Sequence, residues 1–193
     1  VNVQRGGPST GLPTKSEQTD LLQALFGRNG ESPMPVIAAA SPTQCFDAAY
    51  DACKIALEHM TPVVLLTDAF VANGSGAWKL PDLASYPAIN PPYVTPEMKD
   101  NYPPYQRNPE TGVRYWAIPG QEGYTHILGG LEKDSKTGAI STAPDNHDLM
   151  CRLRAENTAP YAVKDLPSAV VVAVAAGRVK HGHAHAMLAE GVH

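Results

Sequence analysis

The sequence predicts an α/β fold in which helices cover both faces of a parallel β-sheet. Two apolar runs without polar alternation, Val36 to Ala40 and Val63 to Thr67, have the pattern of strands that are buried on both faces. A shorter apolar strand is predicted at Val1 and Val3, and segments with helical spacing separate the three strands. Strand and helix therefore alternate along this part of the chain, which is the order typical of a parallel sheet.

The two separating segments carry sequence signals for the start and end of a helix. In the first, Thr14 to Glu17 matches a capping box, a leucine-rich face follows, and Gly27 ends the helix. In the second, Ser41-Pro42 places a cap residue before a proline at the first helical position, and the helix is expected to run to about Met60.

Three loops follow the three predicted strands, over residues 4–14, 40–42 and 68–78. The carboxyl ends of parallel strands meet at one edge of a sheet, where ligands bind in such folds, so we expect these loops to share that edge. Asp68 could act there as a general base or a Mg²⁺ ligand. An acidic residue at a strand end more often caps the next turn, and we expect that structural role.

The loop after the first strand has the composition of an anion site. It reads Gln-Arg-Gly-Gly-Pro-Ser-Thr-Gly-Leu-Pro-Thr from Gln4 to Thr14. Its glycines allow backbone N–H groups to approach a ligand, and the planar fork of Arg5 matches a carboxylate. The hydroxyls make Ser9, Thr10 and Thr14 further candidates. The same composition also suits an ordinary strand-to-helix turn, and Thr14 also suits a helix cap.

The rest of the chain is predicted to hold a long Pro-rich insertion and the start of a second α/β domain. Residues 79–123 interleave prolines with Tyr and Trp, and we expect these aromatics to be buried against another chain or domain. A strand is predicted over 124–131 and a helix after Asp145. We expect one domain over 1–158, lacking its N-terminal part, and a linker with a new βα unit over 159–193.

Composition excludes several function classes. The 193 residues carry a formal net charge of −4, which argues against nucleic acid or an anionic membrane as a partner. The longest apolar run, Ala169 to Ala176, is too short for a membrane span, so a cytoplasmic protein is expected. The cysteines form no C-x-x-C pair, so the chain should hold no iron–sulfur cluster of its own. His181 and His185 could chelate a metal, but a solvated helix start is the preferred interpretation and no metal is expected.

The sequence resembles the α subunit of 2-oxoacid:ferredoxin oxidoreductases, closest to the 2-oxoglutarate type. The motifs that carry the resemblance are the loop 4–14, Thr67-Asp68 with Asn73-Gly74-Ser75, and Gly129 to Asp134 with Asn146-His147. The resemblance covers residues 1–158. It implies a thiamine-diphosphate-dependent, CoA-acylating enzyme. Such an enzyme decarboxylates 2-oxoglutarate oxidatively to succinyl-CoA and passes electrons singly through a [4Fe–4S] cluster to ferredoxin.

The resemblance also implies a division of the active site between subunits. The first domain of the α subunit holds the aminopyrimidine side of the cofactor. A β subunit supplies the diphosphate and Mg²⁺ site and the [4Fe–4S] cluster, so this chain would act only in a hetero-oligomer. A Tyr-Pro-Ile-Thr-Pro segment and the glutamate that activates the aminopyrimidine lie upstream of Val1 in family order. No catalytic residue is therefore assigned to this chain.

Substrate-binding residues are implied by the same resemblance. Arg5 matches the arginine that holds the C1 carboxylate of the oxoacid, and Thr14 matches a threonine that contacts it. Glu132 and Asp134 fall in a segment that the resemblance places near the substrate, although Lys133 beside them also suits a surface turn.

Other functions remain open at this point. The Pro-rich and aromatic segment could serve a non-catalytic assembly fragment that binds the β subunit. A related enzyme could act on pyruvate or another 2-oxoacid. An unrelated α/β carboxylate-binding domain would use Arg5 without thiamine diphosphate.

Overall fold

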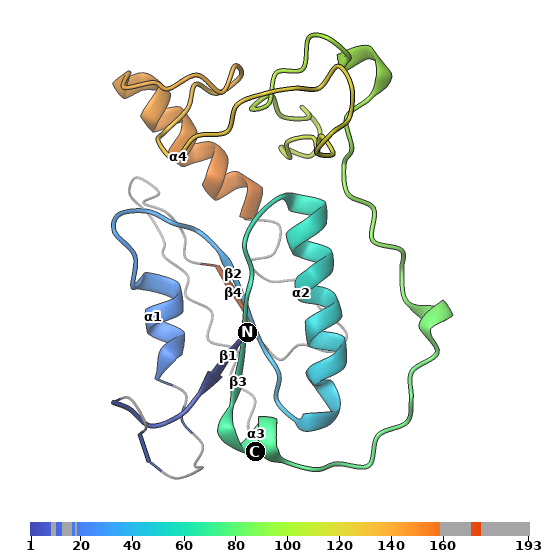
Figure 1. Cartoon of the computed structure of the whole chain (residues 1–193). Coiled ribbons are helices and arrows are strands. Elements are labelled where there is room, and N and C mark those ends of the chain that lie inside the picture. Colours follow the sequence, from blue (N-terminus) through green and yellow to red (C-terminus); the bar gives the residue numbers. More distant parts are fainter. Residues whose placement is uncertain (9–10, 13–16, 18, 159–170, 175–193) are drawn as a thin grey trace.

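The computed structural model describes residues 1–8, 11–12, 17, 19–158 and 171–174, and its strands form one sheet (Figure 1). The strands are β1 (Asn2–Gln4), β2 (Pro35–Ala38), β3 (Val64–Asp68) and β4 (Val171–Val174), in the spatial order β1-β3-β2-β4. β1 and β2 both run parallel to β3, and β4 is antiparallel to β2. The three parallel strands confirm the predicted α/β class.

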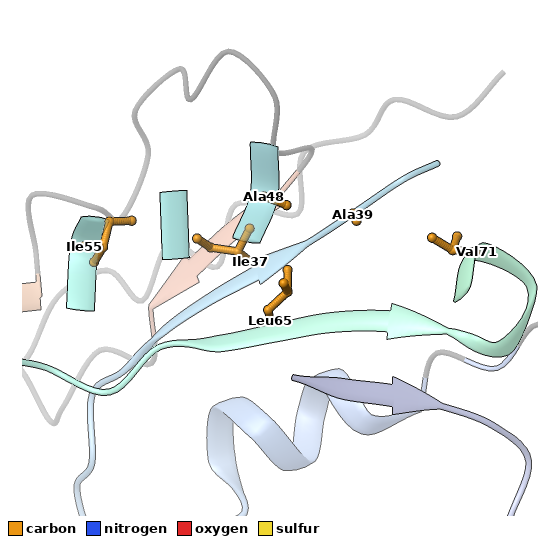
Figure 2. Close-up of a cluster of buried hydrophobic side chains, with 6 residues drawn as sticks. All are labelled: Ile37, Ala39, Ala48, Ile55, Leu65 and Val71. Atoms are coloured by element: carbon orange, nitrogen blue, oxygen red, sulfur yellow. The ribbon is translucent and has the colours of Figure 1, made fainter. Parts of the chain in front are cut away.

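Two helices cover opposite faces of this sheet, α1 (Asp20–Phe26) and α2 (Cys45–His59) (Figure 1). Neighbouring residues of a strand point to opposite faces, so each strand feeds both layers. Ile37 and Leu65 pack with Ala48 and Ile55 of α2 (Figure 2). On the other face, Val36 and Leu66 pack with Ala24 of α1. This double burial explains why β2 and β3 lack polar alternation.

The start of α1 differs from the prediction. The helix begins at Asp20 with Thr19 as its N-cap, and Glu17 is not helical, so the capping box at Thr14 to Glu17 was wrong. Side chains of β1 fix the actual start. The Gln4 Oε1 atom accepts a hydrogen bond from the backbone N–H of Asp20 at 3.1 Å, and the Asn2 amide donates to the Asp20 carboxylate at 2.9 Å.

The boundaries of α2 agree closely with the prediction. A short 3₁₀ turn, Pro42–Gln44, leads into the helix, and Met60 ends it in the left-handed conformation at φ 48°. Beyond β3 follow α3 (Ala69–Asn73), two 3₁₀ turns (Leu83–Ser85 and Pro96–Met98) and α4 (Pro144–Thr158). The predicted helix after Asp145 is confirmed as α4.

The Pro-rich insertion runs along the outer side of α2 and then folds into a lobe beside α4 (Figure 1). Tyr50 of α2 donates to the Pro87 carbonyl, and Tyr86 donates to Asp47. Farther along α2, Glu58 accepts from the backbone N–H of Asn90 at 2.9 Å. The aromatic segment is therefore packed in part on a helix of its own chain, and its burial against another chain or domain stays a prediction.

The strand predicted over residues 124–131 does not form. Side chains bond to backbone carbonyls that would otherwise accept hydrogen bonds from a neighbouring strand. His126 Nδ1 contacts the Tyr124 carbonyl at 2.8 Å, and the Lys133 ammonium, on a residue only 3% exposed, donates to the carbonyls of Gly129 and Leu131. A glycine pair at 129–130 also weakens the strand preference.

The strand of the βα unit predicted over 159–193 forms as β4, and it pairs antiparallel with β2 at the edge of the same sheet. α4 ends at Thr158, the last residue before the predicted linker. The histidines at 181 and 185 and the helix of the predicted βα unit lie outside the described residues, and the domain boundary at residue 158 stays a prediction. Within the described ranges, no helix combines the length and the apolar character needed to cross a membrane.

Candidate functional site

The carboxyl ends of the three parallel strands share one edge of the sheet, as predicted. Gln4 is in register with Asp68, and the backbone N–H of Ala39 donates to the Leu66 carbonyl at 3.1 Å. The loop after α3 lies beside the segment that follows β2. This proximity is seen at Gly76, where an added Cβ would lie only 3.0 Å from the side-chain methyl group of Thr43. The loops that start at Arg5, Ala39 and Asp68 therefore line a single edge.

Arg5 directly follows β1 at this edge. Its side chain is exposed and makes no hydrogen bond or ion pair within the part of the chain that the structure describes. The loop closes behind it, because the N–H of Leu12 donates to the Gly6 carbonyl at 3.0 Å. Gly11 has φ 53°, and a Cβ there would lie 1.7 Å from the Gly6 oxygen, so only glycine fits. The loop thus presents a guanidinium whose donors are not engaged by any of the described residues.

Ser9, Thr10 and Thr14 lie outside the described residues. Their placement relative to Arg5 stays a prediction.

Gln4 also lies at the edge formed by the carboxyl ends of the strands, and its role was not predicted from the sequence. It is 5% exposed, and its amide donates to the Thr67 carbonyl at 3.3 Å while its oxygen caps α1. It therefore fixes the base of the Arg5 loop against β3 and α1. A polar residue at the end of an apolar strand is the signal that could have revealed it. Beside it, the hydroxyl of Thr67 is buried and has no hydrogen-bond partner in the described structure.

Asp68 has the structural role that was expected. It is buried, it is the N-cap of α3, and its carboxylate accepts a hydrogen bond from the backbone N–H of Val71 at 2.7 Å. The short, charge-assisted bond fixes where β3 ends and α3 begins.

Glu132 and Asp134 lie near the amino ends of β2 and β3, at the opposite edge from Arg5. Glu132 contacts His147 Nδ1 at 2.7 Å, and its second oxygen lies 3.8 Å from the Arg154 guanidinium of α4. Asp134 accepts hydrogen bonds from the backbone of Thr137 and Lys136, and these bonds hold the pKa of its carboxyl below the ordinary value. The structure therefore gives Asp134 the surface-turn role and does not bring either residue to the Arg5 edge.

Comparison with known proteins places the fold in a family. Residues 1–126 match the domain family described as "Pyruvate flavodoxin/ferredoxin oxidoreductase, thiamine diP-bdg". This match covers more than half of the chain. The chain belongs to this family.

Relatives of this thiamine-diphosphate-binding family include proteins named for 2-oxoglutarate. The chain is 51% identical over 166 residues to the 2-oxoglutarate oxidoreductase subunit KorA of Mycobacterium tuberculosis, covering 86% of this chain and 25% of that protein. It is 33% identical over 152 residues to the 2-oxoglutarate synthase subunit KorA of Methanothermobacter thermautotrophicus, covering 79% of this chain and 39% of that protein.

A solved structure shares the fold of this family member. It is the 2-oxoglutarate:ferredoxin oxidoreductase from Magnetococcus marinus with 2-oxoglutarate, coenzyme A and succinyl-CoA bound. The TM-score is 0.71 at 34% sequence identity, over 81% of this chain and 27% of that one. The chain thus spans between about a quarter and two fifths of the length of these three relatives.

The described residues of this family member contain no cluster of side chains that could bind a metal ion. No three His, Cys, Asp or Glu side chains converge there. Asp68, the acidic residue at the strand-end edge, is already engaged as a helix cap. We therefore assign no Mg²⁺ ligand to the described residues.

Two substitutions of Asp68 distinguish a role as helix cap from a role in acid–base catalysis. We expect Asp68→Ala to lower the free energy of unfolding by about 0.5–2 kcal/mol, since α3 loses its cap. Asp68→Asn keeps a capping oxygen and should retain both stability and turnover. Thermal unfolding and steady-state rates of the full-length complex check this, and loss of turnover in a stably folded Asp68→Asn variant would contradict it.

The ion pair between Glu31 and Arg154 should make stability fall in acid. Burial pushes the pKa of Glu31 up, but hydrogen bonds from Arg154 and Cys151 outweigh this effect, and the pKa is lowered from its ordinary value. A carboxyl with a lowered folded-state pKa stabilises the fold above its unfolded-state pKa, and this contribution is lost as pH falls through the folded-state value.

We therefore expect a decline in the melting temperature below about pH 4.5. Glu31→Gln should show a shallower decline than the wild type. The exposed Glu110→Gln should follow the wild-type curve, and equal slopes for all three proteins would rule out this role for Glu31.

Proposed function

We propose that this chain is part of the α subunit of a thiamine-diphosphate-dependent 2-oxoglutarate:ferredoxin oxidoreductase. The proposed reaction is the oxidative decarboxylation of 2-oxoglutarate to succinyl-CoA with electrons passed to ferredoxin. The observation that carries the proposal is the exposed guanidinium of Arg5, which has no partner among the described residues, at the carboxyl edge of a sheet in this family. The 51% identity to a protein named for 2-oxoglutarate favours that substrate over pyruvate.

The strand-end edge suits the aminopyrimidine side of thiamine diphosphate. The buried Thr67 hydroxyl has no hydrogen-bond partner in the described structure and could bond to a ring nitrogen or amino group. When bound, the cofactor supplies the carbanion chemistry by which a 2-oxoacid loses its carboxylate. As the family resemblance implies, we assign the diphosphate, Mg²⁺ and [4Fe–4S] sites to a β subunit, and coenzyme A to the role of co-substrate.

Arg5 would bind and orient the C1 carboxylate of the oxoacid. Its planar fork can donate two parallel hydrogen bonds to a carboxylate, and each hydrogen bond of this charged type contributes about 1.5–3 kcal/mol. A fixed carboxylate is aligned for loss as CO₂, which lowers the entropic part of the barrier. Gln4 holds the base of this loop on β3 and would preserve the alignment. Thr14, with Ser9 and Thr10 as further donors, would complete the contacts to the substrate.

The proposal requires partners and a location that fit this chemistry. We propose a hetero-oligomer with a β subunit in the cytoplasm, ferredoxin as the electron acceptor and a small-molecule 2-oxoacid as the substrate. Glu132 and Asp134 are not included in the substrate site, because they lie at the other edge of the sheet.

The test is oxoacid-dependent and coenzyme-A-dependent reduction of methyl viologen by the full-length subunit purified with its partner. Thiamine diphosphate and Mg²⁺ are supplied, and 2-oxoglutarate is compared with pyruvate. We expect reduction with 2-oxoglutarate and far less with pyruvate. Preference for pyruvate would overturn the substrate, and no reduction with any oxoacid would favour a non-catalytic assembly role.

A further inference from the structure

A pocket at the amino edge of the sheet collects three arginines. It has a volume of about 570 Å³ and lies between the insertion lobe, α4 and the residues that precede β2 and β3. Arg107 and Arg114 come from the lobe, and Arg154 comes from α4. No step of the proposed decarboxylation uses these side chains.

Arg107 and Arg114 face each other across an isolated antiparallel β-bridge. Residues opposed in this way project their side chains to the same side, and like charges directly opposite destabilise the pair. Arg107 donates to the Gly112 carbonyl at 2.7 Å, and the Arg114 guanidinium lies 4.4 Å from the centre of the Tyr105 ring. Neither arginine has a carboxylate within 4.0 Å in the described ranges.

The carboxylates of the pocket are engaged elsewhere. Glu31 accepts hydrogen bonds from Arg154, and Glu132 contacts His147 and lies near Arg154. Arg107 and Arg114 therefore have no direct carboxylate partner among the described residues. Burial, followed by the proximity of Arg114 and Arg154, lowers the pKa of Arg107 to about 10, and Glu156 partly opposes this shift.

One further group on the pocket wall lacks a partner. Asn157 donates through its amide nitrogen to the His59 carbonyl at 3.0 Å, but its buried side-chain oxygen accepts no hydrogen bond in the described structure. A ligand of this pocket would carry negative charge and several acceptor oxygens for the arginines, as a phosphate group does.

We propose that this pocket binds a phosphate group, held by the guanidinium forks of Arg107 and Arg114. Two forks match the charge and the tetrahedral oxygens of a phosphate dianion. The group could belong to inorganic phosphate or to a phosphorylated small molecule, and both place the same chemistry between the arginines.

The test is equilibrium dialysis of radiolabelled inorganic phosphate with the full-length complex, loaded beforehand with thiamine diphosphate and Mg²⁺. We expect Arg114→Gln and Arg107→Gln to weaken phosphate binding about ten- to a hundredfold. Arg152→Gln is the matched control, since Arg152 lies on the exposed face of α4 and pairs with Asp148. Arg114→Lys keeps the charge but loses the fork, and it should bind phosphate with intermediate affinity.

Competing anions distinguish the outcomes. Displacement by sulfate but not by chloride at equal ionic strength supports the site. If coenzyme A displaces the labelled phosphate and dephospho-coenzyme A does not, the bound phosphate group belongs to coenzyme A. If neither compound displaces it, the site takes free phosphate or another phosphate ester. Binding that all variants retain, or that chloride abolishes as well as sulfate does, would overturn the proposal. The readout is binding, so it does not depend on oxoacid turnover.

Discussion

Arg5→Ala is expected to raise the KM for 2-oxoglutarate about ten- to a hundredfold in the full-length complex. The guanidinium stands free at the strand-end edge, so its loss removes the charged donors without breaking any contact inside the described structure. The melting temperature should therefore stay close to that of the wild type. Steady-state kinetics with 2-oxoglutarate, together with a thermal scan, measure both effects.

Two further variants sharpen this test. Arg5→Lys keeps the positive charge but loses the bidentate fork, so its KM should fall between those of the wild type and the alanine variant. Arg28→Ala removes an exposed arginine just after α1 and is the matched control. An unchanged KM and kcat for Arg5→Ala would remove this residue from the substrate site. A drop in kcat alone would instead indicate that the contact forms only in the transition state.

Ile37→Ala should produce the largest loss of stability. Ile37 is 0% exposed in the middle of β2 and packs with Leu65, Ala48 and Ile55 (Figure 2). Removal of its side chain beyond Cβ takes apolar area from the core and leaves a cavity, which costs about 2–5 kcal/mol of unfolding free energy. Denaturant unfolding of the full-length subunit measures it. Leu22→Ala, at a site 67% exposed on α1, should cost far less, and equal losses for the two variants would contradict the assigned core.

Local pattern was enough to predict the strands and the long helices. β2 and β3 could be found because burial on both faces removes polar residues from a strand, and Ser41-Pro42 and Met60 bracket α2 closely. The start of α1 could not be found in this way. It depends on Gln4 and Asn2, which reach Asp20 only after β1 has joined the sheet.

The candidate site was predictable where it follows from topology. Parallel strands place their carboxyl ends together, so the loops at Arg5 and Asp68 had to meet. The amino-edge pocket was not predictable, because its contacts join distant segments. Arg154 and Glu31 are 123 residues apart, and no local pattern pairs them. For the same reason, Glu132 could not be placed from its motif alone.

The insertion between α3 and α4 starts and finishes at different ends of the sheet. It leaves from the carboxyl edge after α3, and α4 returns to the amino edge, where Asn157 contacts the last turn of α2. The 15 residues of α2 extend about 22 Å, and an extended chain covers at most about 3.5 Å per residue. A tight turn of two to five residues could therefore not replace this crossover; about seven are the geometric minimum. Deletions before Asn90 should therefore be poorly tolerated, because this stretch follows the length of α2.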